Sequence, residues 1–419
     1  FSFLYAHVPS FVNRSTQLPL YASRLTRAYL GASNPERKTG EPLYHVLPHD
    51  DVPLHEYWDG RRQQHGAPLH IINVTVNETV DGRSQVQQQD RKGCPLALGP
   101  CGLSLGVRHH LALDWPSDAP LVEESREERD PTRFRVFRQA AGTFKGETLS
   151  LGAWMGISGA AFSTGLGYRT SLGLSLLTGI ANVRLGYWWY PGQKGRKHPW
   201  LMYLFPVQGY ILSELIARFP GTAWKRWYLS DGGHFENLGG YELIRRRLPR
   251  IVLVDAECDP DYTFSGLANL VRKARVDFDT DIDFKDDKEL ERLWQEEAGG
   301  IPEAERPPLG ALSALRREEA SEESRACAAL ADVVYDDGSR GRLLYVKAAL
   351  CGKVPVDVRE YHAKHPEFPH ETTADQFFDE AQWESYRKLG SLVSSRLFGA
   401  GDDTPPSRGQ AWLRDYLFA

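Results

Sequence analysis

The stretch that decides the expected fold is Ser230-Asp231-Gly232-Gly233-His234-Phe235-Glu236-Asn237-Leu238-Gly239. The apolar residues just before it, within Arg226–Leu229, predict a strand. After it, apolar residues recur at helical spacing and predict a short helix that ends at Pro249, because proline cannot continue a helix. These residues are Leu238, Tyr241, Ile244 and Leu248. Asp231 is therefore expected on a glycine turn at the end of a strand.

A second strand is predicted at Ile251-Val252-Leu253-Val254-Asp255. Its continuous apolar character is typical of a parallel strand that is buried on both faces. Strand, turn, helix and strand then form one unit, and ligands of such sheets bind outside the carboxyl ends of the strands. Asp231 and Asp255 are both expected at that edge.

The segment from Tyr228 to Asp261 resembles the last catalytic block of the patatin-like phospholipases, most closely their large bacterial members and more distantly the cytosolic phospholipases of animals. In that family an Asp-Gly-Gly or Asp-Gly-Ala turn carries the aspartate of a Ser-Asp dyad, and Asp231 is the matching position. The stretches Leu151–Gly167, Asn182–Trp189 and His365–Gly390 also resemble the bacterial subgroup. The resemblance covers most of the chain from about Leu69 onward.

The resemblance implies an α/β fold: a patatin-like three-layer sandwich with a mainly parallel central sheet, incomplete at its N-terminal side. It implies one hydrolase domain, of which residues 1–419 are the C-terminal portion, with a charged excursion at about 285–325. The implied activity is that of a serine-type lipid acyl hydrolase, phospholipase-like or lysophospholipase-like, for which this chain supplies the aspartate. The expected partner is a phospholipid or another acyl-ester lipid, and the mechanism needs neither metal nor cofactor.

Two further motifs of the family are expected upstream of the aspartate: a glycine-rich oxyanion loop and a G-x-S-x-G nucleophile turn. The sequence contains no such glycine-rich loop, and it begins at Phe1 inside an apolar run, so we expect the nucleophile in a preceding part of a longer polypeptide. Two serines compete for the role. Ser104 in Gly102–Gly106 fits the string, but prolines and glycines before it predict a loop rather than the strand that a nucleophile elbow requires. Ser158 in Gly156–Ala160 has small neighbours, and we interpret it as packing around the site.

A carboxylate within hydrogen-bond reach of a serine can accept its proton without an intervening histidine. The structural alternative for Asp231 is a turn residue that caps the following helix. Asp231 and Glu236 could also form the carboxylate pair of a hydrolase acting on sugars. A third alternative is a non-catalytic lipid-binding or membrane-associated scaffold. Asp255 and the histidines His362, His365 and His370 are left out of catalysis, and a metal site at these histidines is a minor alternative.

The composition predicts a globular chain that gives no reason to expect nucleic-acid binding. Of 419 residues, 41% are hydrophobic and 25% are charged, and the formal net charge is −5, which provides no general basic field for a polyanion. The five cysteines include no C-x-x-C pair, so neither a zinc site nor a disulfide framework is predicted. A reducing, cytoplasmic location is the default expectation.

Contact with a membrane surface is the remaining expectation. Residues 148–168 are uncharged, but their glycines and serines predict a buried segment rather than a spanning helix. The regions 172–189 and 199–216 are rich in aromatic residues, which favour bilayer interfaces, although packing in a core explains them equally well. These residues are Trp188, Trp189, Tyr190, Trp200, Tyr203, Phe205 and Tyr210. Elsewhere, Leu69–Val76 predicts a strand, and 331–347 predicts a hairpin around Asp336-Asp337-Gly338.

Overall fold

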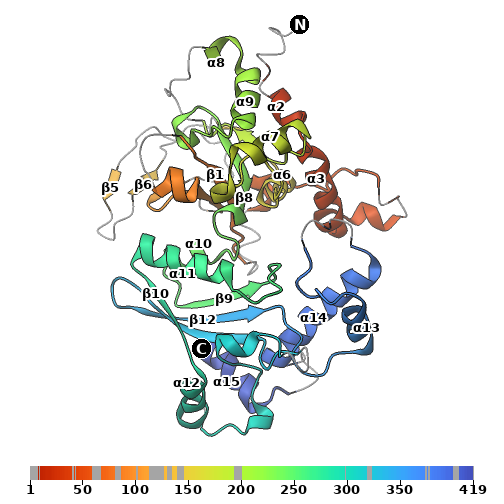
Figure 1. The fold of residues 1–419 in the computed structure, drawn as a ribbon, viewed down its shortest axis with the longest axis vertical. Helices are drawn as coiled ribbons and strands as arrows, with labels where there is room; N and C mark the ends of the chain where they lie inside the picture. Colours follow the sequence, from red (N-terminus) through yellow and green to blue (C-terminus); the bar gives the residue numbers. More distant parts are fainter. Residues whose placement is uncertain are drawn as a thin grey trace. The chain divides into compact units, whose positions relative to one another are not determined.

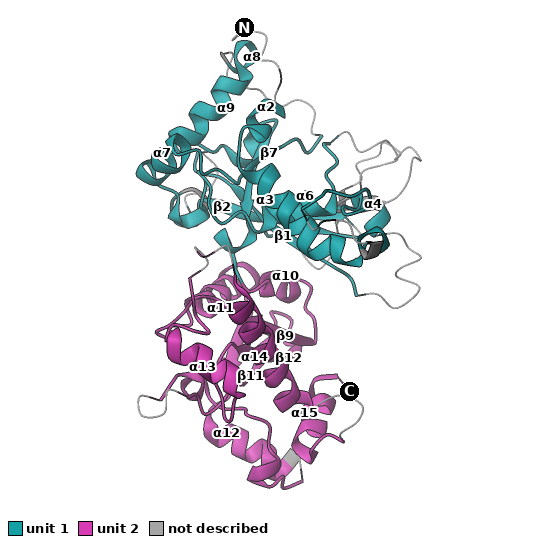
Figure 2. Cartoon of the chain, turned by 90° about the vertical axis from the view of Figure 1, so that its right-hand side faces the viewer, with its two compact units in different colours: residues 1–237 teal, residues 238–419 magenta. Residues whose placement is uncertain are grey.

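The chain folds as two compact units, residues 1–237 and 238–419 (Figure 2). The computed structural model describes residues 8, 10–39, 42, 44–58, 68–80, 86–100, 102–112, 127–129, 135–138, 146–192, 201–297, 299–318, 323–372, 375, 378–399 and 405–418.

The first unit is built on an eight-stranded sheet in the order β5-β6-β4-β3-β2-β1-β8-β7. The six neighbouring strands from β4 to β7 are antiparallel throughout, whereas β4 and β6 run parallel. The strands are β1 (Ile72–Asn77), β2 (Gly93–Gly99), β3 (Gly102–Leu105), β4 (His109–Ala112), β5 (Glu127–Arg129), β6 (Arg135–Arg138), β7 (Tyr187–Trp189) and β8 (Trp227–Asp231).

Helices of the first unit pack on the sheet around β1 and β8 (Figure 1). Successive side chains of β8 point to opposite faces of the sheet and so belong to two different cores. Trp227 and Leu229 pack with α3 and α6, whereas Tyr228 packs with α2 and α9. The helices are α2 (Ser10–Arg14), α3 (Leu18–Leu25), α4 (Leu54–Tyr57), α6 (Leu151–Ser158), α7 (Leu172–Ile180), α8 (Leu201–Leu204) and α9 (Pro206–Leu215). Two short 3₁₀ turns matter for the site: η5 (Gly167–Arg169) and η7 (Gly232–His234).

The second unit has a four-stranded mixed sheet in the order β10-β11-β12-β9, in which β9 and β12 are parallel. Leu344 and Val346 of β12 share one core with the helices α13, α14 and α15, while α10 packs against β9 through Gly240 and Leu253. The elements are α10 (Gly240–Arg245), β9 (Arg250–Asp255), α11 (Ser265–Phe278), β10 (Asp281–Phe284), α12 (Asp287–Arg292), β11 (Ala328–Val334), β12 (Arg340–Lys347), α13 (Val356–Lys364), α14 (Glu380–Phe398) and α15 (Arg408–Phe418).

The local predictions around the deciding stretch are confirmed. β8 ends at Asp231, α10 and β9 follow in the predicted order, and β1 forms close to its predicted place. The predicted hairpin is β11 and β12, whose turn contains Gly338 at a φ of 80°.

The predicted fold class, a sandwich with a mainly parallel central sheet, is wrong. β8 pairs antiparallel with β1 and β7, whereas β9 belongs to the other sheet and the other unit. β9 does run parallel to β12, but it is an edge strand, and its Val254 is 69% exposed. An apolar run indicates a strand without identifying its partners, and the partner strand β1 lies more than 150 residues from β8 in sequence. Asp231 and Asp255 therefore do not stand on neighbouring strands.

The predicted charged excursion folds as short helices that have an apolar side. α12 begins with a capping box between Asp286 and Glu289, and the charged residues of the helix face outward. Leu290, Trp294 and Leu315 are buried. The stretch therefore contributes to the packing of the second unit as well as to its surface.

The aromatic-rich regions divide between core and surface. Trp188, Trp189 and Tyr210 are buried, so core packing explains these three, whereas Tyr203 and Phe205 are exposed. Trp200 lies outside the described residues.

Candidate functional site

Asp231 is the last residue of β8 and caps the 3₁₀ turn η7. Its Oδ1 accepts a hydrogen bond of 2.7 Å from the amide of Gly233. The two glycines of the turn are required by space: a Cβ on Gly232 would lie 2.5 Å from the carbonyl oxygen of Asn73, and one on Gly233 would lie 2.2 Å from Oδ1 of Asn237. Neither glycine has a positive φ, so close approach of neighbouring groups explains the Asp-Gly-Gly sequence here.

The carboxyl group of Asp231 is largely buried but poorly compensated. Among the described residues, the amide of Gly233 provides its only hydrogen bond, and it forms no ion pair. Burial raises the pKa of Asp231 from 3.8 to about 6, and the Gly233 amide opposes this rise only in part. Asp231 is thus a carboxylate whose second oxygen has no hydrogen bond among the described residues, and its raised pKa lets it accept a proton near neutral pH.

The face of the sheet that carries Asp231 also carries α3 and the C-terminal end of α6. Asp231 follows Trp227 and Leu229 on the same side of β8, and both of these pack with the two helices. The pKa of Tyr21 in α3 is raised by burial and then by the negative charge of Asp231, which places the phenol within electrostatic reach of the carboxylate. A Cβ on Gly159 would lie 2.8 Å from the Tyr21 hydroxyl oxygen. No pattern in the sequence had indicated Tyr21.

On the opposite face, a chain of hydrogen bonds holds the turn. Nδ2 of Asn77 donates to Oγ of Ser230 (2.7 Å), which in turn is 2.8 Å from Nδ1 of His234. Nε2 of His234 lies 3.2 Å from the carbonyl oxygen of Ala161. Because a carbonyl oxygen can only accept, Nε2 carries the proton, and Nδ1 accepts from the Ser230 hydroxyl. Every donor in this series of hydrogen bonds therefore has a defined acceptor.

His234 positions the turn as a neutral side chain. Burial lowers the pKa of His234 to about 4, and the positive charge of Arg169 also acts against protonation. Asn77 is a buried polar residue in β1, but the sequence of this strand alternates apolar and polar residues, so no break in the pattern singles it out.

Neither serine with a partial nucleophile motif sits on a strand-to-helix elbow. Ser104 lies within β3 rather than in the predicted loop; it is 5% exposed, and its Oγ is 2.8 Å from Nδ1 of His110 on the paired strand β4. Ser158 is the last residue of α6, and its hydroxyl donates to the carbonyl oxygen of Asn73 (2.7 Å). A helix C-terminus disfavours developing negative charge, unlike the N-terminus that follows a nucleophile elbow. The structure thus brings neither hydroxyl into a hydrogen bond with Asp231.

Asp255 is fully engaged in the second unit. Its Oδ2 accepts from the Tyr345 hydroxyl and lies 3.0 Å from Nζ of Lys347, and the side chains of Asp255 and Lys347 are 0% exposed. Lys347 also lies 3.4 Å from Asp259. This arrangement ties β9 to β12 and gives Asp255 a structural role.

The other candidate residues form no metal site in the part of the chain that the structure describes. No group of three or more histidine, cysteine or acidic side chains there is placed to hold a metal ion, which includes His362, His365 and His370. Cys258, Cys327 and Cys351 form no disulfide within the described part of the chain, and Cys101 lies outside the described residues. Glu236 is buried, close in sequence to Asp231.

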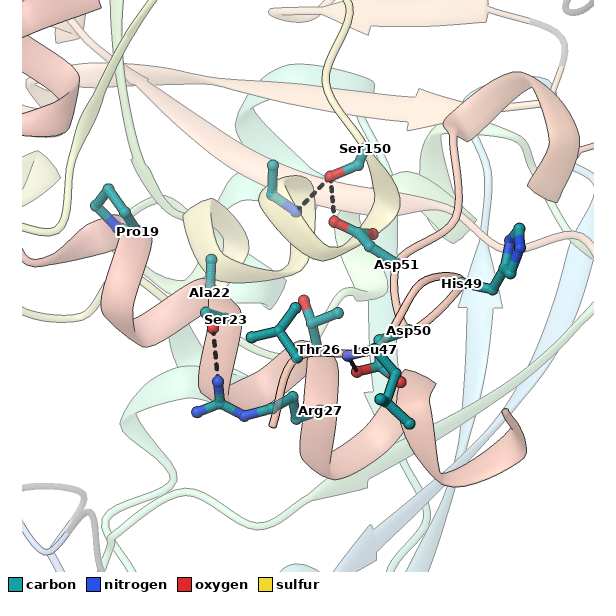
Figure 3. A pocket seen from close by; sticks show the side chains of 12 residues that line it. Pro19, Ala22, Ser23, Thr26, Arg27, Leu47, His49, Asp50, Asp51 and Ser150 are labelled. Atoms are coloured by element: carbon teal, nitrogen blue, oxygen red, sulfur yellow. Dashed lines mark hydrogen bonds between the residues drawn. The ribbon is translucent and has the colours of Figure 1, made fainter. Parts of the chain in front are cut away.

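A cavity of about 320 Å³ lies at the N-terminal end of α6 and was not predicted (Figure 3). Ser150 donates to Oδ2 of Asp51 (2.6 Å), and Oδ1 of Asp51 accepts from the Gly152 amide (2.8 Å), so the start of the helix is already capped. Arg27 is bound to Ser23 and Asp50 to Arg37. Asp231 is not among the residues that line this cavity. The cavity lies at the N-terminal end of α6, whereas the face of the sheet that carries Asp231 also carries the C-terminal end of this helix.

No family model, curated protein or solved structure matches the chain. The resemblance to the patatin-like phospholipases therefore stays a prediction from the residues quoted above. Among the described residues, no helix has both the length and the apolar character needed to cross a membrane.

Proposed function

We propose that this chain is part of a lipid acyl hydrolase in which Asp231 is the general base of a Ser-Asp dyad. The observation that carries the proposal is the state of this carboxyl group. It stands at a strand end, burial raises its pKa to about 6, and in the described residues it has one amide donor and no cation. Buried carboxylates that serve only a structural role are expected to have their charge paired, as Asp255 does.

The chemistry needs one proton acceptor and one nucleophile. Oδ1 of Asp231 is held by the Gly233 amide, which leaves Oδ2 to accept the proton of a serine hydroxyl. The serine oxygen then attacks the ester carbonyl, and the departing alkoxide takes up the proton as the acyl-serine forms. Water gives a proton to the same carboxylate and attacks the acyl-serine, and the carboxyl group returns that proton to the serine oxygen as the fatty acid leaves. Each cycle consumes one ester and one water.

The proposal assigns the nucleophile to a serine other than Ser104 and Ser158. Ser104 is buried within a strand, and Ser158 is held by a backbone carbonyl at the wrong end of a helix. Since neither Ser104 nor Ser158 is placed to act as the nucleophile, the second candidate, a lipid-binding scaffold that lacks catalysis, is also favoured. Both candidates share a lipid partner and peripheral membrane contact.

An activity measurement on Asp231→Asn in the full-length protein tests the proposal. The substitution keeps the size and the hydrogen bond to Gly233 but removes the basicity. We expect kcat for p-nitrophenyl butyrate and for a phospholipid to fall roughly 10³-fold with little change in KM, because general-base catalysis contributes about 10²–10⁴-fold. Asp261→Asn, an exposed aspartate of the second unit, is the matched control and should retain activity.

Near-normal turnover by Asp231→Asn would reject the role of the base. A wild-type protein that binds lipid but cleaves no ester would favour the scaffold. Cleavage of glycosides rather than esters, lost on substitution of Asp231 or Glu236, would support the carboxylate-pair alternative.

A further inference from the structure

The helix α7 reverses the usual distribution of polar and apolar side chains. Its buried residue is Ser175, whose hydroxyl donates to the carbonyl oxygen of Thr164 (2.6 Å). Its large apolar side chains face outward: Ile180 is 78% exposed, Leu177 66% and Leu172 54%, and Leu174 and Leu176 are exposed as well. Folding therefore leaves these side chains in water, and contiguous exposed apolar area of this kind marks an interaction surface.

The neighbouring helix α9 extends the exposed apolar area. α7 and α9 lie side by side in both views, and the contact is close, since a Cβ on Gly179 would lie 2.5 Å from Cδ2 of Leu215 (Figures 1 and 2). Leu212 of α9 and Ile216, which follows its last residue, are exposed too, as is Val183 beyond α7. We call these residues the α7–α9 surface: Leu172, Leu174, Leu176, Leu177, Ile180, Val183, Leu212 and Ile216.

In the sequence span that carries this surface, exposed charge is of one sign, although the whole chain has a formal net charge of −5. Between Thr148 and Ser230 the sequence has one acidic residue, Glu214, which is buried and paired with Arg184 at 3.1 Å. The same span contains the basic residues Arg169, Arg184, Lys194, Arg196, Lys197, Arg218, Lys225 and Arg226. Arg169 precedes α7 and Arg218 follows α9, and both are exposed. The apolar area is thus accompanied by cations without exposed acids in the described part of this span.

We propose that the α7–α9 surface docks on the headgroup boundary of an anionic lipid bilayer. Leucine and isoleucine side chains enter the acyl region while flanking arginines meet the lipid phosphates, as in helices that lie in a membrane interface. A second copy of the chain fits less well, because a symmetric contact would bring like charges together at Arg169 and Arg218. This surface does not depend on catalysis by Asp231.

The surface begins beside the Asp231 turn. η5, which ends at Arg169, packs on η7, and a Cβ on Gly167 would lie 2.3 Å from the carbonyl oxygen of His234. α7 starts three residues after η5 ends. Docking through α7 would thus hold the lipid surface near the segment that carries Asp231.

Vesicle flotation with the full-length protein tests the proposal, using phosphatidylcholine vesicles with and without phosphatidylglycerol. The double variant Leu177→Ser/Ile180→Ser should bind at least about tenfold more weakly, because it removes two large apolar side chains that would enter the acyl region. Arg218→Gln should weaken binding about fivefold, and only on the vesicles that contain phosphatidylglycerol. Val276→Ser is the matched control: this exposed valine lies on α11 of the second unit, and binding should not change.

Equal binding by the wild type and the double variant would overturn the proposal. Failure of the wild type to float, together with self-association in sedimentation that Ile180→Ser abolishes, would also overturn it and assign the surface to a second copy. Asp231→Asn should float like the wild type, so failure of the docking proposal and failure of the catalytic proposal give different results. Since the substituted side chains are exposed, a thermal melt like that of the wild type is expected and checks the fold.

Discussion

Asp231 and Asp255 end two consecutive strands of the chain, yet their surroundings differ in kind. Asp255 is fully buried and faces Lys347 and the Tyr345 hydroxyl. Asp231 is also largely buried, but among the described residues it has the Gly233 amide alone. One carboxylate has its charge compensated, whereas the other retains the free-energy cost of losing water.

The difference separates a structural acid from a reactive one. A compensated pair fixes two strands to each other. An uncompensated carboxyl group shifts its pKa upward instead, and it can exchange a proton with a bound hydroxyl. Position at a strand end does not distinguish the two, because both residues share it.

The largest expected effect on stability follows from removing the cation beside Asp255. Lys347→Met leaves Asp255 and Asp259 without their common partner, which lies 3.0 and 3.4 Å from them. Breaking a buried pair from one side costs about 3–5 kcal/mol, so we expect a loss of that size in the free energy of unfolding, measured by urea denaturation. Lys364→Met removes the exposed pair with Glu360 and should change stability little. An equally small effect for Lys347→Met would show that Asp255 is not compensated as described.

A pH-dependent effect of somewhat smaller size is expected at Asp231. The pKa of Asp231 is raised from 3.8 in the unfolded chain to about 6 in the folded chain, so the protonated form favours folding. This contribution is fully present below about pH 4 and is lost as the pH rises through about 6, with a total of at most about 3 kcal/mol.

Asp231→Asn removes this titration. The stability of the variant relative to the wild type should therefore rise between pH 4 and about pH 6.5, and urea denaturation at several pH values measures the difference. If the difference in stability between the variant and the wild type stayed constant over that range, the Asp231 carboxyl group would be compensated like that of Asp255. The contrast between the two aspartates would then be lost.

The smallest effect is expected at the G-x-S-x-G string. Ser104→Ala removes the hydrogen bond to His110, which should cost about 1 kcal/mol in unfolding free energy. Ester hydrolysis should be unchanged, because Ser104 lies within β3, buried and paired with β4. A loss of turnover with normal stability would move the nucleophile to Ser104 and revise the assignment of the site.

Local features of the fold could be predicted from the sequence. The ends of β8 and β9, the glycine turn between β8 and α10, and the β11–β12 hairpin follow from periodicity and turn residues within short windows. Sheet membership could not be predicted, because Asp231 pairs with Val74, far away in sequence. The apolar run of β9 suggested a central strand, yet Val254 is 69% exposed at an edge.

For the site, the sequence indicated Asp231 but not what surrounds it. Tyr21 and Asn77 reach the turn from α3 and β1, and only the three-dimensional fold brings them there. The aromatic-rich regions 172–189 and 199–216 contain α7 and α9, but their exposed apolar side chains are mainly leucines, whereas Trp188 and Trp189 form core. In α7 the serine is buried and the leucines are exposed, so the usual rule that apolar residues are buried does not hold. Composition alone therefore cannot distinguish core residues from surface residues in this helix.

The most direct test of the account is the pKa of the Asp231 carboxyl group in the folded protein. Carbon-13 NMR of aspartate-labelled protein, with the signal assigned by its absence in Asp231→Asn, measures it. We expect a midpoint of about 6. A midpoint at or below the ordinary value of 3.8 would show a compensated carboxylate and would contradict the role of Asp231 as the base.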